Sequence, residues 1–268
     1  MSLPAGPLSL DLLDAHVEAL WDGADPPFPE VLRPAADEEG ELVRWALDQL
    51  RTIPREPRDV FTRRIGDLLT DMRSRRCPWN AAALRLLDNS YNFAATGPRR
   101  HEDWAHDVLA VLHRSVPDPR GWVRVDWDRT NTARDTVPAY PFDPPAASQL
   151  PGRLYPLEPE AAVAALAVMT EQWQSEYAPV RSRPDRDAVL SDARTLLDRY
   201  GPTASYWTNA TAAASGPAPD FLATGLEGTD AHGFLTDAYL NGLDLFYDLG
   251  VIAVNDDEVG AFWSFGAF

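Results

Sequence analysis

Two aspartates close a predicted strand near the middle of the chain. Residues 121–127 (GWVRVDW) are rich in aromatic and β-branched types and predict a strand. Asp126 and Asp128 stand two positions apart at its end, and on extended backbone such carboxylates share a face and can bind a hard cation such as Mg²⁺. No third ligand is evident nearby in the sequence, so we assign no metal and no cofactor.

Residues 126–130 have the form D-x-D-x-T, which resembles the first motif of the haloacid-dehalogenase-type phosphotransferases. The resemblance implies that Asp126 attacks phosphorus and that Asp128 is the acid–base group. Residues 251–257, an apolar run ending in two aspartates, are similar to the family's fourth motif. Arg124 inside the first strand, the absence of lysine and the lack of α/β alternation depart from the family's pattern, so we favour a turn at the end of a strand.

An enzyme built on these aspartates would take further groups from later segments. His232 could serve as an acid–base group, and so could Tyr206 in a polar-aromatic strand. Residues 128–157 contain six prolines and either cover an active site or hide short strands. In this hypothesis the protein is a metabolic enzyme that acts on a small molecule by acid–base or metal-assisted chemistry, with these two residues and the two aspartates as catalytic groups.

Other reactive residues fit a structural interpretation better. His101 and His106 are five positions apart on a predicted helix, whereas a metalloprotease helix needs a spacing of four, so a solvated polar face is favoured. Cys77 follows arginines that would stabilise a thiolate, but an unpaired cysteine at a helix junction is more often buried. Ser264 lacks the glycine that a nucleophile elbow has two positions earlier.

Composition excludes several classes of protein. The 268 residues carry 41 acidic and 24 basic side chains, a net charge of −17, and every basic residue is arginine. Without lysine the chain cannot be a P-loop NTPase, a protein kinase or a Schiff-base enzyme, and the bias is typical of a GC-rich bacterial genome. One cysteine excludes an intramolecular disulfide.

The net negative charge of the chain argues against nucleic acid and anionic lipid as partners. The longest apolar run, 161–169, is too short to span a membrane, and with no signal peptide we expect a cytoplasmic protein.

Hydrophobic periodicity predicts an α+β fold. A helical part over residues 1–116 precedes a mixed part over 117–268 with few strands and a C-terminal β-hairpin, and the two could form one continuous domain. The last helices expected in the first part cover 78–93 and 101–115. The elements expected in the second part are strands over 121–127 and 204–209, helices over 159–177, 187–200 and 230–249, a mobile segment over 210–228 and a hairpin over 251–265.

The expected helix over 230–249 carries an acidic stripe. Its polar residues recur at offsets that place them on one helical face, and they are Asp230, Asp237, Asn241, Asp244 and Asp248. The last 69 residues contain nine acidic side chains and no arginine or lysine. The stripe is either a solvated face or a binding surface for a basic partner. Our first hypothesis is a cytoplasmic acidic protein that binds a basic protein through this stripe in an inhibitor, immunity or accessory role, and the alternative is the enzyme described above.

The spacing of Asp126 and Asp128 generates a testable prediction. Because two carboxylates fall short of the six or more oxygen ligands that a hard cation takes, we expect no micromolar binding of Mg²⁺ or Mn²⁺ in a calorimetric titration. Tight binding that the Asp126→Asn variant loses would contradict this prediction.

Overall fold

The computed structural model describes residues 78–87, 91–116, 137, 139–173, 178–237 and 244–267. The chain divides into two compact units, residues 1–81 and 82–268, and nearly all of the described residues belong to the second. Cys77, Asp126, Asp128 and Asn241 lie outside the described residues, as do the helices expected before residue 78 and the strand expected over 121–127.

The described residues form helices and one sheet, so the expected mixture of α and β structure is confirmed. The helices are α4 (Pro78–Leu87), α5 (Trp104–Leu112), α7 (Pro159–Val168), α8 (Arg186–Asp198) and α9 (Phe221–Thr224). The strands are β1 (Asn92–Pro98), β2 (Tyr155–Leu157), β3 (Ser205–Thr208), β4 (Leu245–Val254) and β5 (Glu258–Ala267). Short 3₁₀ helices cover Leu150–Arg153, Val180–Ser182 and Thr211–Ser215.

The five strands form one antiparallel sheet in the order β1-β5-β4-β3-β2. Strands β4 and β5 are the expected C-terminal hairpin. Its turn is closed by Asn255, whose Oδ1 accepts hydrogen bonds from the backbone N–H groups of Asp257 (2.9 Å) and Glu258 (2.7 Å). Side-chain capping of this kind is why asparagine is favoured in tight turns.

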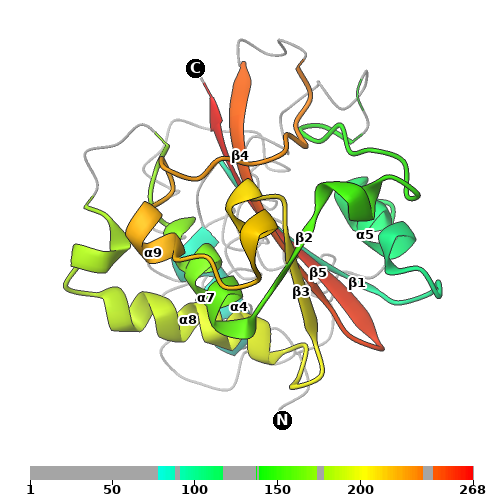
Figure 1. Ribbon diagram of the computed structural model, residues 1–268. Coiled ribbons are helices and arrows are strands. Elements are labelled where there is room, and N and C mark those ends of the chain that lie inside the picture. Colours follow the sequence, from blue (N-terminus) through cyan, green and yellow to red (C-terminus); the bar gives the residue numbers. More distant parts are fainter. Residues whose placement is uncertain are drawn as a thin grey trace, which may run out of the picture. The chain divides into compact units, whose positions relative to one another are not determined.

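Side chains alternate between the two faces of the sheet, and each face packs on its own layer. One face of β5 presents Val259, Ala261, Trp263 and Phe265 to a core that includes Val108 and Val111 of α5. The other face carries Phe262, whose ring meets Tyr200, the second residue after α8, edge to face. In Figure 1 the sheet runs between α5 on the right and α4, α7 and α8 on the left. The sheet is therefore buried on both sides.

In two places where the sequence predicts part of a helix, the structure has a strand. The helix expected over 78–93 ends at Leu87, and Asn92–Pro98 pairs instead with β5. The helix expected over 230–249 is wrong, because β4 begins at Leu245 and pairs with β5 through nine register positions. Pairing with a distant strand outweighs the local helical spacing of the aspartates, since strand formation depends on tertiary neighbours more than helix formation does.

The remaining elements agree with the sequence to within a few residues or are shorter. The helices expected over 101–115 and 187–200 form as α5 and α8, and the strand expected over 204–209 forms as β3. The helix expected over 159–177 ends at Val168. The segment over 210–228, expected to be mobile, contains a 3₁₀ helix and α9. The proline-rich segment hides a short strand, β2, and an isolated bridge between Phe142 and Leu235.

Gly250 in β4 is required by the packing of Trp263. The two residues are paired in the hairpin, and a β-carbon on Gly250 would collide with the indole ring. Adding a methyl group in a filled core costs about 1–3 kcal/mol. We therefore expect the Gly250→Ala variant to lose about 3 kcal/mol in its free energy of unfolding, measured by urea denaturation.

The matched control for this prediction is Gly152→Ala, because no atom lies within 4 Å of a β-carbon at that position. Its free energy of unfolding should stay within about 0.5 kcal/mol of the parent value. Equal stability of the two variants would show that the indole does not need the space above Gly250.

Candidate functional site

The carboxylate of Asp248 is the centre of a buried polar network. Its Oδ2 accepts hydrogen bonds from the indole N–H of Trp263 (2.8 Å), the side-chain amide of Asn209 (3.1 Å) and the backbone N–H of Phe234 (3.1 Å). Asp248 is only 5% exposed. Burial raises the pKa of this carboxyl to about 6, although the three hydrogen bonds act in the opposite direction. This is a correction, because the acidic stripe placed Asp248 on a solvent-exposed helical face.

Asn209 joins this network to the neighbouring loop. Its Oδ1 accepts from the backbone N–H of Gly250 (2.7 Å), and its amide also donates to the carbonyl of His232 (2.9 Å). The imidazole of His232 stacks on Tyr155, and its Nε2 lies 2.9 Å from the Tyr155 hydroxyl. Asn209 thereby brings two of the predicted site residues, His232 and Asp248, into one structure, although their side chains do not contact each other.

Tyr206 lies on the face of the sheet opposite to the one that packs on α5 and carries Trp263. It is 7% exposed, and burial raises its pKa, with a further contribution from the nearby carboxylate of Asp198 at the end of α8. Its neighbour Trp207 packs against the core on the α5 side, so successive residues of β3 point to opposite faces. No interaction between Tyr206 and His232 occurs in the described part of the chain. The residues proposed for acid–base catalysis are therefore not brought together there.

A second buried carboxylate, Asp107, ties the start of α5 to the preceding loop. Its Oδ1 lies 2.7 Å from Nδ1 of His101, and its Oδ2 lies 3.3 Å from Nε of Arg99. Burial alone would raise the pKa of Asp107, but the hydrogen bonds from His101 and from backbone N–H groups outweigh it, and the pKa is lowered. His106 is solvent-exposed, as the sequence predicts, and Ser264 lies buried within β5.

Both carboxylates are almost fully covered, and both bind groups that come from separate segments of the fold. Among the described residues, no group of three or more histidine, cysteine or acidic side chains could hold a metal ion. No helix in the described ranges is both long enough and apolar enough to cross a membrane.

The acidic side chains of the C-terminal third form the most conspicuous surface. Three of the nine acidic residues after Arg199 have structural roles: Glu258 pairs with Arg199, Asp220 caps α9, and Asp248 is buried. The other six form no ion pair with any described residue, and they are Glu227, Asp230, Asp237, Asp244, Asp256 and Asp257. Their charge is therefore not neutralised within the described part of the molecule.

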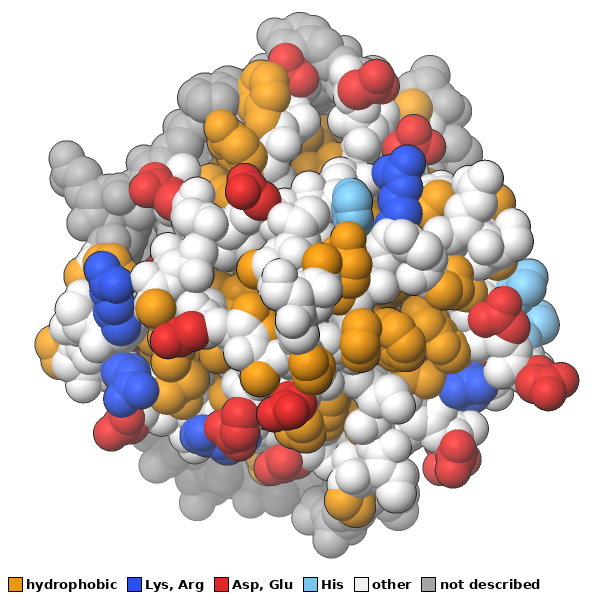
Figure 2. Space-filling view, viewed as in Figure 1, with side chains coloured by type: hydrophobic (Ala, Val, Ile, Leu, Met, Phe, Trp, Pro, Cys, Tyr) orange, Lys and Arg blue, Asp and Glu red, His pale blue; other side chains and the backbone are white. Residues whose placement is uncertain are grey.

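Exposed aromatic side chains lie beside part of this acidic surface. A β-bulge between Leu245 and Tyr247 interrupts the pairing of β4 at its start. Phe246 is 51% exposed and Tyr247 is 50% exposed, and the ring of Trp173 stacks on Tyr247 at 5.3 Å. Figure 2 shows apolar side chains over the beginning of β4, at the top of the view, with acidic side chains around them.

Asp237 and Asp244 belong to the same end of β4. Asp244 immediately precedes the strand. Asp237 is three residues after Phe234, and the backbone N–H of Phe234 donates a hydrogen bond to Asp248 in the first half of β4. Both aspartates are at least partly exposed. We call this region the docking surface, and it consists of Trp173, Asp237, Asp244, Phe246 and Tyr247. The sequence predicts that the two aspartates belong to a binding surface, but it does not predict this for the aromatic residues. In the expected helix over 230–249, Phe246 would have been one of the residues that make apolar contacts away from the acidic face.

Comparison with known proteins gives no relative. No protein-family model matches the chain, and no curated protein and no solved structure matches it significantly.

The raised pKa of Asp248 generates a prediction about stability. The folded protein binds the proton more tightly than the unfolded chain, whose aspartates have a pKa near 3.9, so this group lowers the free energy of unfolding as pH rises from about 4 to about 6. A shift of two pKa units corresponds to about 2–3 kcal/mol. Compared with the parent, Asp248→Asn should lack this part of the pH dependence in urea denaturation between pH 4 and 7.

The exposed Asp237 supplies the control for that experiment. Asp237→Asn removes the same charge without touching the network, so its pH dependence should follow the parent curve. The assignment would be wrong if Asp248→Asn and the parent protein lost stability equally over this pH range.

Proposed function

We propose that the protein binds a basic protein partner through the docking surface, in an inhibitor, immunity or accessory role. The observation that carries the proposal is the combination of exposed aromatic rings and unneutralised carboxylates at one end of β4. The partner that fits is a protein with an arginine- or lysine-rich surface around an apolar contact.

The two kinds of side chain contribute in different ways. Carboxylates that lack a basic neighbour attract a positively charged surface over a distance comparable to the Debye length and so raise the association rate. Aromatic residues supply apolar area at low conformational cost and are enriched among the residues that dominate binding energy. Asp237 and Asp244 would therefore act mainly on association, and Phe246 and Tyr247 mainly on dissociation.

Because Asp248 is buried, fewer acidic residues are available to contact a partner than the sequence predicts. A carboxylate that is 5% exposed and accepts three hydrogen bonds cannot also reach a partner. The acidic residues available for docking are therefore Asp237 and Asp244, which precede β4 in the chain, rather than a continuous helical stripe. The enzyme hypothesis gains no support from the described residues, since His232 and Tyr206 are held apart.

Affinity capture at about 50 mM and 500 mM salt, followed by kinetics with the purified partner, tests the proposal. The double variant Asp237→Asn/Asp244→Asn should slow association about three- to tenfold and flatten its salt dependence, because two steering charges are removed. Phe246→Ser/Tyr247→Ser should instead accelerate dissociation at least tenfold, because the rings are the apolar anchors.

The hairpin turn offers a matched control. Asp256 and Asp257 are exposed and free of ion pairs with described residues, but they lie at the other end of β4. The variant Asp256→Asn/Asp257→Asn changes the net charge equally and should leave both rates nearly unchanged. If it slows association as much as the docking-surface variant does, the attraction is a property of net charge and the proposed surface is wrong.

A further inference from the structure

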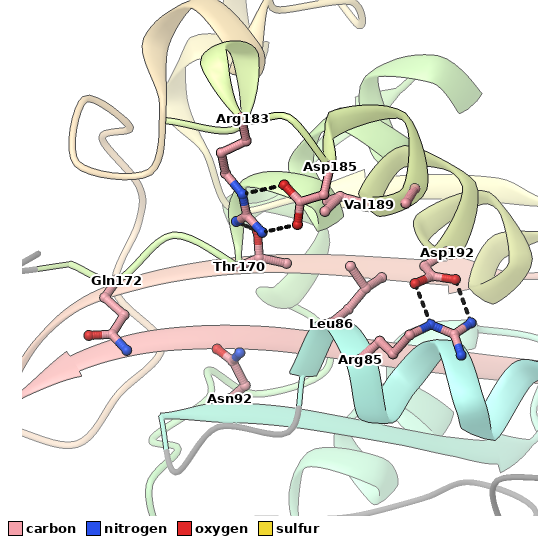
Figure 3. Close-up of a pocket in the computed structure, with 10 residues that line it drawn as sticks. Arg85, Leu86, Asn92, Thr170, Gln172, Arg183, Asp185, Val189 and Asp192 are labelled. Carbon is pink, nitrogen blue, oxygen red and sulfur yellow. Dashed lines mark hydrogen bonds and ion pairs between the residues drawn. The ribbon is translucent and has the colours of Figure 1, made fainter. Parts of the chain in front are cut away.

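A cavity of about 450 Å³ lies between α4, the first residue of β1, the turn after α7, and α8. All of its lining residues belong to the second unit of the chain. Figure 3 shows side chains from these elements pointing toward a common space. This cavity takes no part in the docking surface.

The charged groups of the wall neutralise one another. Arg183 donates from Nε and Nη2 to the two carboxylate oxygens of Asp185, at 2.9 and 2.7 Å, and Arg85 binds Asp192 in the same two-pronged way at 2.7 and 2.6 Å. The remaining Nη1 of Arg183 donates to the hydroxyl of Thr170. An anion would have to compete with a carboxylate already bound to each arginine, and a cation would compete with the arginines. The wall therefore favours an uncharged ligand.

The amide of Asn92 points into the cavity and has no hydrogen-bond partner among the described residues. Asn92 is 2% exposed, and its side chain makes no hydrogen bond with any described residue. In Figure 3 its amide is directed into the cavity, on the same side as the amide of Gln172. The amide atoms of Asn92 are not among the fully covered polar atoms that lack a partner, so solvent in the cavity reaches them, and a ligand that displaces this solvent has to supply both a donor and an acceptor.

We propose that this cavity binds a neutral small molecule through a carboxamide group. A carboxamide is the complement of the Asn92 side chain, because its N–H can donate to Oδ1 while its carbonyl accepts from Nδ2. Leu86 and Val189 line the same cavity and provide apolar contact for the hydrocarbon part of the ligand. Gln172, which is exposed at the edge of the cavity, offers a second amide to the ligand.

Three probes of the same shape but different charge test the proposal, namely benzamide, benzoate and benzamidine. Ligand-observed NMR titration of the full-length protein should give a Kd of about 1 mM for benzamide, as expected for a ligand of nine heavy atoms. Benzoate and benzamidine should bind at least about tenfold more weakly, because their charges find no free counter-charge in the wall. Equal binding of the three probes, or no binding of any, would overturn the proposal, the latter by showing a cavity filled only by water.

Two variants connect the binding to the cavity. Asn92→Leu removes the buried amide at similar size and should abolish benzamide binding, while Gln172→Leu should weaken it several-fold. Gln172 is exposed, so its variant keeps the test decisive if the Asn92 variant does not fold. Gln149→Leu is the matched control, since Gln149 is also exposed but lies outside the cavity, and its Kd should equal that of the parent. Unchanged benzamide binding in a folded Asn92→Leu would overturn the assignment, and so would unchanged binding in Gln172→Leu if the Asn92 variant does not fold.

Discussion

The hydrogen bond from the indole of Trp263 to the buried carboxylate of Asp248 is the interaction on which this end of the sheet depends. It joins the two strands of the C-terminal hairpin through side chains as well as backbone. Asn209 extends it to the end of β3, and the N–H of Phe234 extends it to the preceding loop. A carboxylate is tolerated inside the protein because it accepts hydrogen bonds from three separate places in the chain, at Trp263, Asn209 and Phe234.

This arrangement also decides which acidic residues remain available at the surface. Because Asp248 is buried and bound by Trp263, the carboxylates that are exposed to solvent near the start of β4 belong to Asp237 and Asp244. The bulge in β4 exposes Phe246 and Tyr247 beside them. A strand that buries one aspartate and a bulge that exposes two aromatic rings thus produce the proposed docking surface together. The cavity at Asn92 has the opposite character, since its charges are paired internally.

Several features were predictable because they depend on neighbours in the sequence. The spacing of apolar residues predicts α5 and α8, and the two apolar runs on either side of Asn255–Asp257 predict the hairpin. The excess of acidic residues after Arg199 likewise predicts an acidic surface. Helix periodicity, turn chemistry and net charge are properties of short segments or of composition, so they can be read without the fold.

The tertiary structure alone decided the positions of Asp248, Asn92 and β4. The spacing of Asp237, Asp244 and Asp248 fits a helical face, but nine register positions shared with β5 outweigh that local pattern. The partners of Asp248 are 15 residues away at Trp263 and 39 residues away at Asn209, and no local pattern connects them. Asn92 likewise enters a cavity only because β1 pairs with β5 while α8 covers that face. Burial of a polar side chain depends on groups that are distant in sequence, and for that reason it was outside the reach of sequence analysis.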